Sequence, residues 1–199
     1  MFKSTKIIEL GSCAFRQPTA TSHCKFLHGY RLTAKFWFQA DTLDQNNWVV
    51  DFGGLKDLKT LLQNQFDHTT CISRLDPVLD EFKRLEQAGV CDLRIMDGVG
   101  IEKFAEWCWS VANKHVMEIT DDRCRCIKAE VFEHENNSAI YEKQTISVES
   151  VDSVENSTAM NDFMGNKKEP KREGVPINTN KNKTTNKWVD SESKSVWGI

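Results

Sequence analysis

Residues 30–40 read YRLTAKFWFQA, and this stretch decides the fold. Its side chains alternate with a period of two, which is the pattern of a β-strand with one buried face. The face predicted to be buried carries Leu32, Ala34, Phe36, Phe38 and Ala40. We therefore predict a half-buried strand here and build the rest of the fold outward from it.

The chain on both sides of this stretch contains further periodic segments. Strand-type patterns predict strands at residues 5–15, 48–52, 91–96, 123–133 and 138–142. Helical spacing predicts amphipathic helices over residues 54–65, 76–89 and 101–116. The polar loop before residues 48–52 indicates that this short strand forms a hairpin with residues 30–40. Strands with helices inserted between them predict an α+β fold, with the helices on one face of the sheet.

The composition disfavours several classes of protein. The 199 residues carry 26 basic and 29 acidic side chains, a formal net charge of −3, which argues against a strongly basic nucleic-acid binder. No apolar run approaches the roughly 18–20 residues of a membrane span, and the start MFKSTKIIEL lacks the apolar region of a secretory signal. We therefore expect a cytoplasmic protein with neither a membrane nor a nucleic acid as its partner.

The cysteines support this expectation. There are seven, an odd number, and no CxxC pair occurs among them, so a disulfide framework is not indicated. We expect reduced thiols that pack mostly as small apolar side chains, with one of them reactive.

The composition changes near residue 144. Residues 145–199 contain no cysteine, are rich in serine, threonine and asparagine, and have no sustained apolar period. Such a segment cannot bury enough apolar surface to offset the entropy lost on ordering it. We therefore expect one domain over residues 1–144 and a disordered tail over residues 145–199, in which Trp188 and Trp197 have no assigned role.

Three short clusters contain side chains capable of chemistry. The first surrounds Cys24, which stands between His23 and Lys25 and close to His28. Cationic neighbours lower the pKa of a thiol and make it a base or a nucleophile. Two imidazoles at this spacing could instead share a metal. A buried thiol with two surface histidines is the third interpretation that the spacing allows.

The other two clusters are also open to more than one interpretation. In Asp67-His68 a carboxylate can orient an imidazole for proton transfer, although an acidic residue at a helix end also serves as a cap. Glu133 could accept two hydrogen bonds from the edge of a ring that resembles guanidine. The following Asn136-Asn137 is equally suited to a simple turn.

Taken together, the order and spacing of these clusters resemble the 6-pyruvoyl-tetrahydropterin synthase and 6-carboxytetrahydropterin synthase family. Five colinear motifs carry the resemblance over residues 8–143: Cys24 with Leu27-His28-Gly29, Trp48-Val49-Val50-Asp51-Phe52, Phe66-Asp67-His68, Ile101-Glu102-Lys103-Phe104-Ala105-Glu106-Trp107, and Glu133 with Asn136-Asn137 and Ala139-Ile140-Tyr141. The resemblance implies the tunnelling fold, or T-fold. This fold is an antiparallel four-stranded sheet with helices on one face, and it closes into a barrel on oligomerisation. A homo-oligomer with active sites between subunits and a small pterin as substrate is implied as well.

The resemblance also implies roles for individual residues. Cys24 matches the family's active-site thiol, which moves a proton at the substrate side chain. Asp67 and His68 match the pair that carries the second proton. Glu133 matches the carboxylate that binds the 2-amino and ring N–H edge of the pterin. Glu102 matches the helix glutamate assigned to substrate binding, without the threonine that usually precedes it.

The family normally holds a catalytic zinc with three histidines, and this chain departs from that pattern. His28 matches one ligand, but Tyr30 stands in place of the second, and the first falls near residues 14–16, which offer no good ligand. Because catalytic zinc usually has three protein ligands, one match would not hold the ion with useful affinity. Without the metal, polarising the substrate would fall to a nearby cation: Lys25, Arg16 or Arg31.

Three functional hypotheses follow. The leading one is a 6-carboxytetrahydropterin synthase-like lyase that acts on 7,8-dihydroneopterin triphosphate on the route to queuosine-type deazapurines. The second is an enzyme of the 6-pyruvoyl-tetrahydropterin synthase type or a metal-free, aldolase-like relative that acts on a related pterin. The third is a non-catalytic pterin-binding module whose tail recruits a partner.

Overall fold

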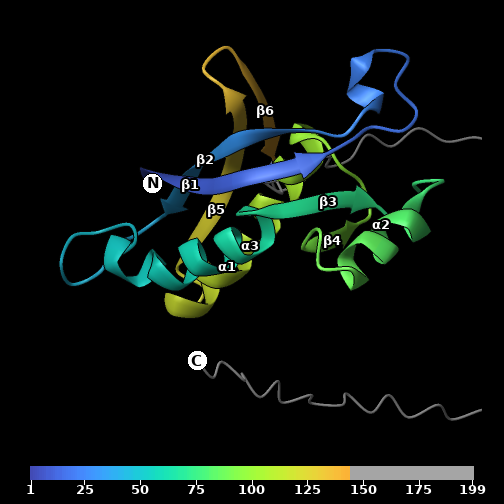
Figure 1. Ribbon diagram of the computed structural model, residues 1–199. Helices are drawn as coiled ribbons and strands as arrows, with labels where there is room; N and C mark the ends of the chain where they lie inside the picture. Colours follow the sequence, from blue (N-terminus) through green and yellow to red (C-terminus); the bar gives the residue numbers. More distant parts are fainter. Residues whose placement is uncertain (144–199) are drawn as a thin grey trace, which may run out of the picture. The chain divides into compact units, whose positions relative to one another are not determined.

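The structure, a computed structural model, describes residues 1–143 (Figure 1). The tail predicted over residues 145–199, with its two tryptophans, lies outside the described residues. None of the helices within residues 1–143 is long and apolar enough to cross a membrane.

Six strands form one sheet. They are β1 (Phe2–Phe15), β2 (His28–Ala40), β3 (Thr69–Ser73), β4 (Leu93–Met96), β5 (Cys124–His134) and β6 (Asn137–Glu142), in the spatial order β4-β3-β1-β2-β5-β6. Strands β1, β2, β5 and β6 pair antiparallel, as predicted, whereas β3 is parallel to β1 and β4 is parallel to β3. The predicted four-stranded antiparallel sheet is therefore corrected to six strands, with two short parallel strands at one edge.

Helices α1 (Lys56–Phe66) and α3 (Ile101–Ile119) cover one face of the sheet, as predicted (Figure 1). The alternation in β2 buries Leu32, Phe36 and Phe38 completely in the core that includes residues of these helices. Each fully buried side chain of this size contributes about 1.5–3 kcal/mol to folding. We call this side of the sheet the core face and the opposite side the outer face.

Helix α2 (Leu79–Gln87) lies on the outer face, which corrects the prediction that all helices share one face. Cys71 belongs to the main core, but the next residue, Ile72, packs in a separate cluster with Phe82 of α2 and Leu93 of β4. Consecutive residues of a strand point to opposite faces of the sheet. Strand β3 is therefore covered on both sides, as parallel strands usually are.

The short strand predicted at residues 48–52 is wrong, and so is its hairpin with residues 30–40. Residues 48–51 are irregular and lead into the 3-10 helix Phe52–Leu55, and β2 pairs with β1 and β5 instead. The carboxylate of Asp44 accepts the backbone N–H of Trp48 at 2.8 Å. The guanidinium of Arg123 donates to the carbonyl oxygen of Val49 at 3.0 Å. Side chains thus satisfy backbone groups that a strand would have paired with a neighbouring strand.

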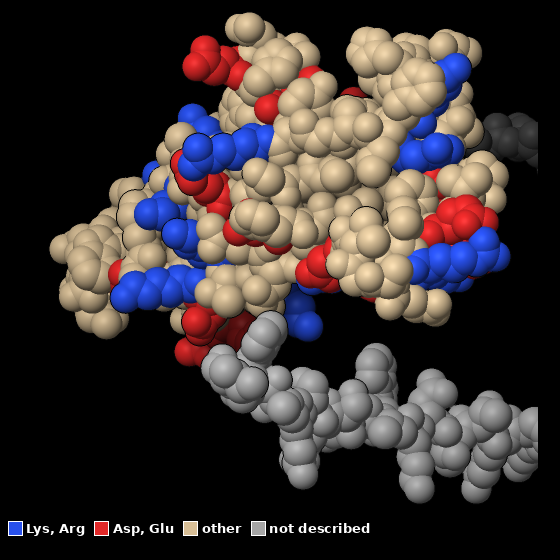
Figure 2. Space-filling model, viewed as in Figure 1, with Lys and Arg blue, Asp and Glu red and all other residues tan. Residues whose placement is uncertain are grey.

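Basic and acidic side chains are interspersed over the face seen in Figure 2. Some form short-range pairs, such as Arg84 with Glu81 at 2.6 Å and Lys103 with Glu106 at 2.7 Å. Exposed pairs of this kind contribute only about 0–1 kcal/mol each, so the sheet and its core determine the stability of the fold.

Candidate active site

Cys24 is partly exposed and lies in the loop between β1 and β2. It occupies the short 3-10 helix His23–Lys25, so the sequence cluster around it stays together in space. Its backbone N–H donates to Oγ of Ser22 at 3.4 Å, and its carbonyl oxygen accepts the N–H of Gln17 at 2.9 Å. The loop therefore holds the thiol on the surface by backbone contacts at both ends of the residue.

Most of the other thiols are structural. All seven cysteines lie within the described residues without forming a disulfide, and five are buried: Cys13, Cys71, Cys108, Cys124 and Cys126. Burial raises the pKa of Cys126 to about 12 and also raises the pKa values of Cys108 and Cys124. These thiols stay neutral at physiological pH, so they are poor nucleophiles compared with a partly exposed cysteine.

Asp67 and His68 contact each other directly. Asp67 follows the last residue of α1, and its Oδ1 atom lies 2.9 Å from Nδ1 of His68 and 3.2 Å from the backbone nitrogen of Ser12. Because a carboxylate only accepts hydrogen bonds, Nδ1 of His68 carries a proton, and Nε2 of the neutral ring keeps its lone pair. The imidazole is 87% exposed. Asp67 is thus the residue that ends α1, and its side chain also contacts the imidazole; the proton-transfer role of the pair stays a prediction.

A bulge in β1 makes room for this pair. The register of β1 against β2 shifts between Glu9 and Gly11, and Gly11 has a φ angle of +103°. A Cβ atom at Gly11 would lie only 2.1 Å from Oδ1 of Asp67. Sequence reasoning missed this residue, although an isolated glycine inside a strand pattern is the usual signal of a bulge or a close approach.

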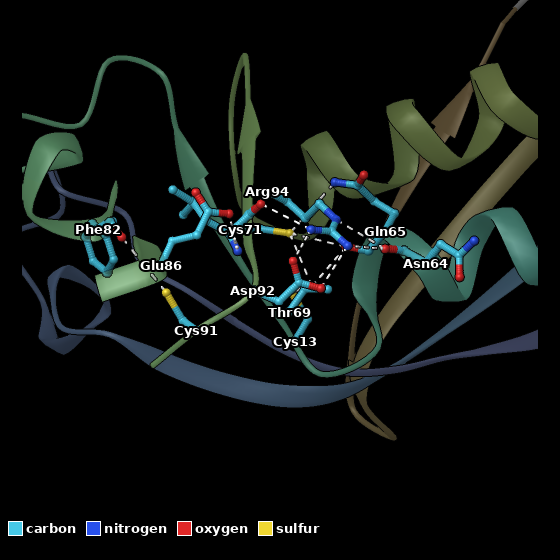
Figure 3. A network of polar contacts seen from close by, with 11 residues as sticks. Cys13, Asn64, Gln65, Thr69, Cys71, Phe82, Glu86, Cys91, Asp92 and Arg94 are labelled. Atoms are coloured by element: carbon cyan, nitrogen blue, oxygen red, sulfur yellow. Dashed lines mark hydrogen bonds and ion pairs between the residues drawn. The ribbon is translucent and has the colours of Figure 1, made fainter. Parts of the chain in front are cut away.

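A polar network fixes the end of α1 just before the pair (Figure 3). The guanidinium of Arg94 on β4 donates to the carbonyl oxygen of Asn64 at 3.0 Å and pairs with the carboxylate of Asp92. The hydroxyl of Thr69 donates to the carbonyl oxygen of Gln65 at 2.9 Å. The last carbonyl groups of a helix have no hydrogen-bond donor within the helix. Here the side chains of Arg94 and Thr69 are the donors.

Phe15, His28 and Tyr30 form a cluster of three rings at the positions compared above with the zinc ligands. Phe15 pairs with His28 across β1 and β2, and their ring centroids are 4.9 Å apart. Tyr30 lies 5.7 Å from His28 and 6.1 Å from Phe15. The cluster sits at the core face, because Phe15 also packs edge-on against Phe104 of α3 at 5.1 Å.

The ring cluster does not fit a zinc ion. Phe15 has no ligand atom, and a phenol such as that of Tyr30 is not among the usual zinc ligands. Nδ1 of His28 lies 2.7 Å from the carbonyl oxygen of Phe26 and therefore carries the proton, which leaves a single lone pair on Nε2. Within residues 1–143, no group of three or more His, Cys, Asp or Glu side chains could hold a metal ion.

Glu133 is largely buried, with 18% of its side chain exposed, near the end of β5. Its Oε1 atom accepts a hydrogen bond from Nδ2 of Asn137 at 2.8 Å and lies 3.7 Å from Nε2 of His134. The ring of His134 is in turn 6.3 Å from that of Tyr30. Asn137 thus begins β6 and also orients the carboxylate, a role that sequence reasoning did not assign to it.

Glu102 is exposed in the first turn of α3, and the loop of Cys24 reaches this helix end. Gly100 precedes the helix with a φ angle of +105°. A Cβ atom there would lie 2.4 Å from Nε2 of Gln17 and 3.4 Å from Oε2 of Glu102. The backbone N–H of Gln17 also donates to the carbonyl oxygen of Cys24. Gln17 therefore links the loop of Cys24 to the helix end that carries Glu102, and sequence reasoning missed this link.

His68 opens onto the outer face. It lines a cavity of about 450 Å³ together with Ser12 and Ala14 of β1 and with Tyr30 of the ring cluster. Ser12 and Ala14 alternate with Cys13 and Phe15, which are buried in the core, so strand geometry places this wall of the cavity on the outer face.

One subunit therefore does not bring all the predicted residues together. The ring cluster reaches Glu133 through His134, and its Tyr30 also lines the cavity of His68, whereas Cys24, Glu102 and Glu133 do not line that cavity. A further cavity of about 500 Å³ is lined by residues that include Arg74, Lys103 and Trp107, and none of the predicted residues lines it.

Comparison with known sequences gives one family and several curated relatives. The model of the family described as 6-pyruvoyl tetrahydropterin synthase matches residues 9–144. The 6-carboxy-5,6,7,8-tetrahydropterin synthases of Rickettsia conorii and Rickettsia bellii are each 34% identical over 77 residues, which are 38% of this chain and 55% of the relative. The chain thus spans little more than half the length of the curated relatives it matches.

Solved structures share the fold. An uncharacterised protein from Wolinella succinogenes matches 72% of this chain and 98% of its own, with a TM-score of 0.62 and 15% identity. The 6-pyruvoyl tetrahydropterin synthase of Caenorhabditis elegans matches 72% of this chain and 96% of its own, with a TM-score of 0.51 and 15% identity. At this identity the likeness concerns the fold alone, and it confirms the predicted T-fold class.

Proposed function

The chain belongs to the 6-pyruvoyl tetrahydropterin synthase family, and we propose that it is a lyase of pterin metabolism. In this proposal it resembles the 6-carboxytetrahydropterin synthases, and its substrate is 7,8-dihydroneopterin triphosphate. A cytoplasmic location and a place on a queuosine-type deazapurine route belong to the same proposal. The observation that carries it is the carboxylate of Glu133, which is largely buried and oriented by Asn137.

Glu133 is suited to the ring of a pterin. The 2-amino group and the neighbouring ring N–H form a pair of donors, and an ionised carboxylate is an acceptor with two oxygens. Two parallel, charge-assisted hydrogen bonds would fix both the position and the orientation of the ring. Because Asn137 already donates a hydrogen bond to one of these oxygens, the carboxylate is oriented before the pterin binds.

Proton transfer is assigned to Cys24 and to the Asp67-His68 pair. Cys24 takes a proton from the side chain of the substrate, and the triphosphate leaves in the elimination. His68, whose Nε2 is oriented by the contact between Nδ1 and Asp67, carries the second proton. In the 6-carboxy branch one water molecule is consumed and acetaldehyde is also lost, which leaves a carboxylate on the pterin.

A homo-oligomer would complete the site. His68 lines a cavity with the outer-face residues Ser12 and Ala14, and Glu133 does not line it, so in this proposal a second copy places its outer face against the Glu133 end of the first. Within the described residues, β1 pairs with β3 only through Cys13–Phe15, which leaves most of one edge of β1 unpaired. Strand β6 is the other long edge of the sheet. Edges of this kind invite pairing with another chain, and closure into a barrel would remove them.

Incubation of the purified protein with 7,8-dihydroneopterin triphosphate, followed by mass spectrometry, tests the proposal. The expected products are 6-carboxytetrahydropterin, acetaldehyde and triphosphate, whereas a pyruvoyl product would favour the other branch. We expect Glu133→Gln to lose pterin binding, and the exposed neighbour Glu135→Gln to retain it as a matched control. Pterin binding without turnover would instead support a non-catalytic module. Neither binding nor turnover would reject the proposed function.

A metal-free enzyme is the second candidate, and the ring cluster is the observation that favours it. Only one of the three positions that correspond to zinc ligands offers a nitrogen lone pair. An aldolase-like reaction on a related pterin would need the same carboxylate and the same proton carriers. Assay with dihydroneopterin, which lacks the triphosphate, separates this candidate from the first.

A further inference from the structure

The three cations that the sequence offers for polarising the substrate are all engaged elsewhere. Arg16 forms an ion pair of 3.0 Å with Asp76, whose side chain is completely buried. Arg31 pairs with Glu9 at 2.6 Å and neighbours Tyr30 in β2, so its side chain points to the outer face. Lys25 lies 5.1 Å from the centre of the ring of Phe26. Each of these groups would have to give up a contact before it could reach the substrate.

Tyr30 is placed differently. It lies on the core face between His28 and His134, at ring distances of 5.7 and 6.3 Å, and His134 in turn contacts Glu133. Within residues 1–143 its hydroxyl has no hydrogen-bond partner, yet it is not among the buried unpaired atoms, so it is open to solvent. A free donor therefore stands on a ring that neighbours His134, the contact of Glu133, and Tyr30 also lines the cavity of His68.

We propose that Tyr30 is a catalytic residue that takes the place of the absent metal ligands. Its hydroxyl donates a hydrogen bond to a side-chain hydroxyl oxygen of the dihydropterin substrate, next to the carbon that loses a proton. Phe15 and His28 hold the phenol by ring contacts on two sides. This assignment rests on the proposed function, because it adds a donor to the same site.

The proton transfer balances with water as the only further reactant. The C–H bond of the side-chain carbon attached to the ring breaks, and its proton passes to the thiolate of Cys24. The electron pair of that bond forms a C=C bond to the ring carbon, the pair of the adjacent C=N bond moves onto the ring nitrogen, and this nitrogen takes a proton from water. The proton of Tyr30 stays on its own oxygen, and the hydrogen bond draws electron density from the hydroxyl oxygen, which makes the neighbouring C–H bond more acidic. Losing a single donor of this kind typically lowers kcat by about 10²–10³.

The first experiment compares the two tyrosines of the chain. Tyr30→Phe removes one oxygen and keeps the ring contacts, whereas Tyr141→Phe does the same for a tyrosine that packs against Trp109 at 5.2 Å. For Tyr30→Phe we expect kcat to fall by about 10²–10³ with KM changed less than about threefold. Tyr141→Phe should match the wild type. Equal kcat values for Tyr30→Phe and the wild type would overturn the assignment.

The second experiment measures metal binding directly and needs no turnover. Phe15→His combined with Tyr30→His places three imidazoles where the three rings now lie. Calorimetric titration with zinc chloride should then give at least about tenfold tighter binding than the wild type, with the single variant Tyr30→His in between. Circular dichroism before the titration shows whether the double variant is folded, and the Tyr30→His variant provides the measurement if it is not. Zinc binding by the wild type as tight as by the double variant would overturn the inference.

The two failures are distinguishable. If wild-type protein has no turnover but the zinc titration gives the expected order, the proposed function fails and the replacement of the metal site stands. If wild-type protein turns over and loses its activity when zinc is removed by a chelator, the proposed function stands and the role of Tyr30 is refuted.

Discussion

The two faces of the sheet differ in how their side chains interact. On the core face the rings of Phe15, His28 and Tyr30 contact one another at 4.9 to 6.1 Å, and at the other end of β2 burial keeps the thiol of Cys126 neutral. On the outer face of β2 and β5 the contacts include those of charged and exposed groups. There the ring of Trp37 has the ammonium groups of Lys35 and Lys128 at 4.8 and 4.4 Å from its centre.

This difference explains why the proposed site needs both faces. A base such as His68 must exchange its proton, which an exposed imidazole does readily. The hydrogen bonds between a carboxylate and a bound ring are stronger when the carboxylate is shielded from water, as that of Glu133 is. Because a sheet separates these two environments, a site that needs both is most simply built between two copies of the chain.

Substitution of Asp67 tests the outer-face half of this comparison and has the largest expected effect. Asp67→Asn can present an N–H to the imidazole, which would favour the wrong tautomer of His68 and lower kcat by up to about 10⁴-fold. Pterin binding should be unchanged, because Glu133 is untouched. The control is Asp41→Asn, an exposed residue next to the end of β2. Steady-state kinetics of the three proteins decide the matter, and a kcat within threefold of the wild type would exclude a proton-transfer role for the pair.

Substitution of Gly11 tests the bulge at which the Asp67 side chain meets β1. Gly11→Ala forces a residue at φ +103° and puts a Cβ atom 2.1 Å from Oδ1 of Asp67, so we expect a loss of about 2–4 kcal/mol in unfolding free energy. Gly89→Ala is the matched control, since Gly89 has a φ of +72° but nothing within 4 Å of its Cβ position. It should lose only about 1 kcal/mol. If urea denaturation gave equal losses of unfolding free energy for the two variants, a close approach of Asp67 to Gly11 would be excluded.

Much of the fold follows from periodicity, and the errors have identifiable causes. Strand β2 and helices α1 and α3 have one buried face each, so their patterns are visible in the sequence. Strand β3 was not predicted because all five of its residues, Thr69–Ser73, are buried and no alternation remains. Residues 48–52 include the buried Val49 and Val50, which imitate a strand while Asp44 and Arg123 satisfy the backbone.

The site residues could be named from their motifs, but their arrangement could not. Nothing in the sequence shows that Asp67 fits into a bulge 55 residues away, or that Asn137 holds Glu133. The division between faces depends on the pairing of β1 with β2 and β3, which is long-range information. The ring cluster is an intermediate case: the departure from three histidines is visible in the sequence, while the contacts among the replacing rings are not.

The core-face thiols provide a test by pH. The pKa of Cys126 is raised to about 12 from an ordinary value of 9.0, so above pH 9 the unfolded chain releases a proton that the folded chain keeps. Stability is therefore full below pH 9 and falls as the pH rises towards 12, by about 1.4 kcal/mol per pH unit for this thiol. Cys126→Ala should show a correspondingly smaller fall between pH 7 and 10 than the wild type, and Cys91→Ala should behave as the wild type. Parallel curves for all three proteins in urea denaturation would contradict the assigned burial.

The contact of the lysines with Trp37 has the smallest expected effect, and it tests whether the outer face is exposed. A double-mutant cycle of Trp37→Leu and Lys128→Met should yield a coupling energy of about 0.5–1 kcal/mol, the value of an exposed contact between a cation and a ring. The same contact is worth about 2 kcal/mol or more once water is removed from it. Measured over a range of protein concentrations, the coupling thus reports whether another chain covers this face. A coupling that stays below 1 kcal/mol at every concentration means that the outer face around Trp37 remains wet, so that any second copy must join through the strand edges.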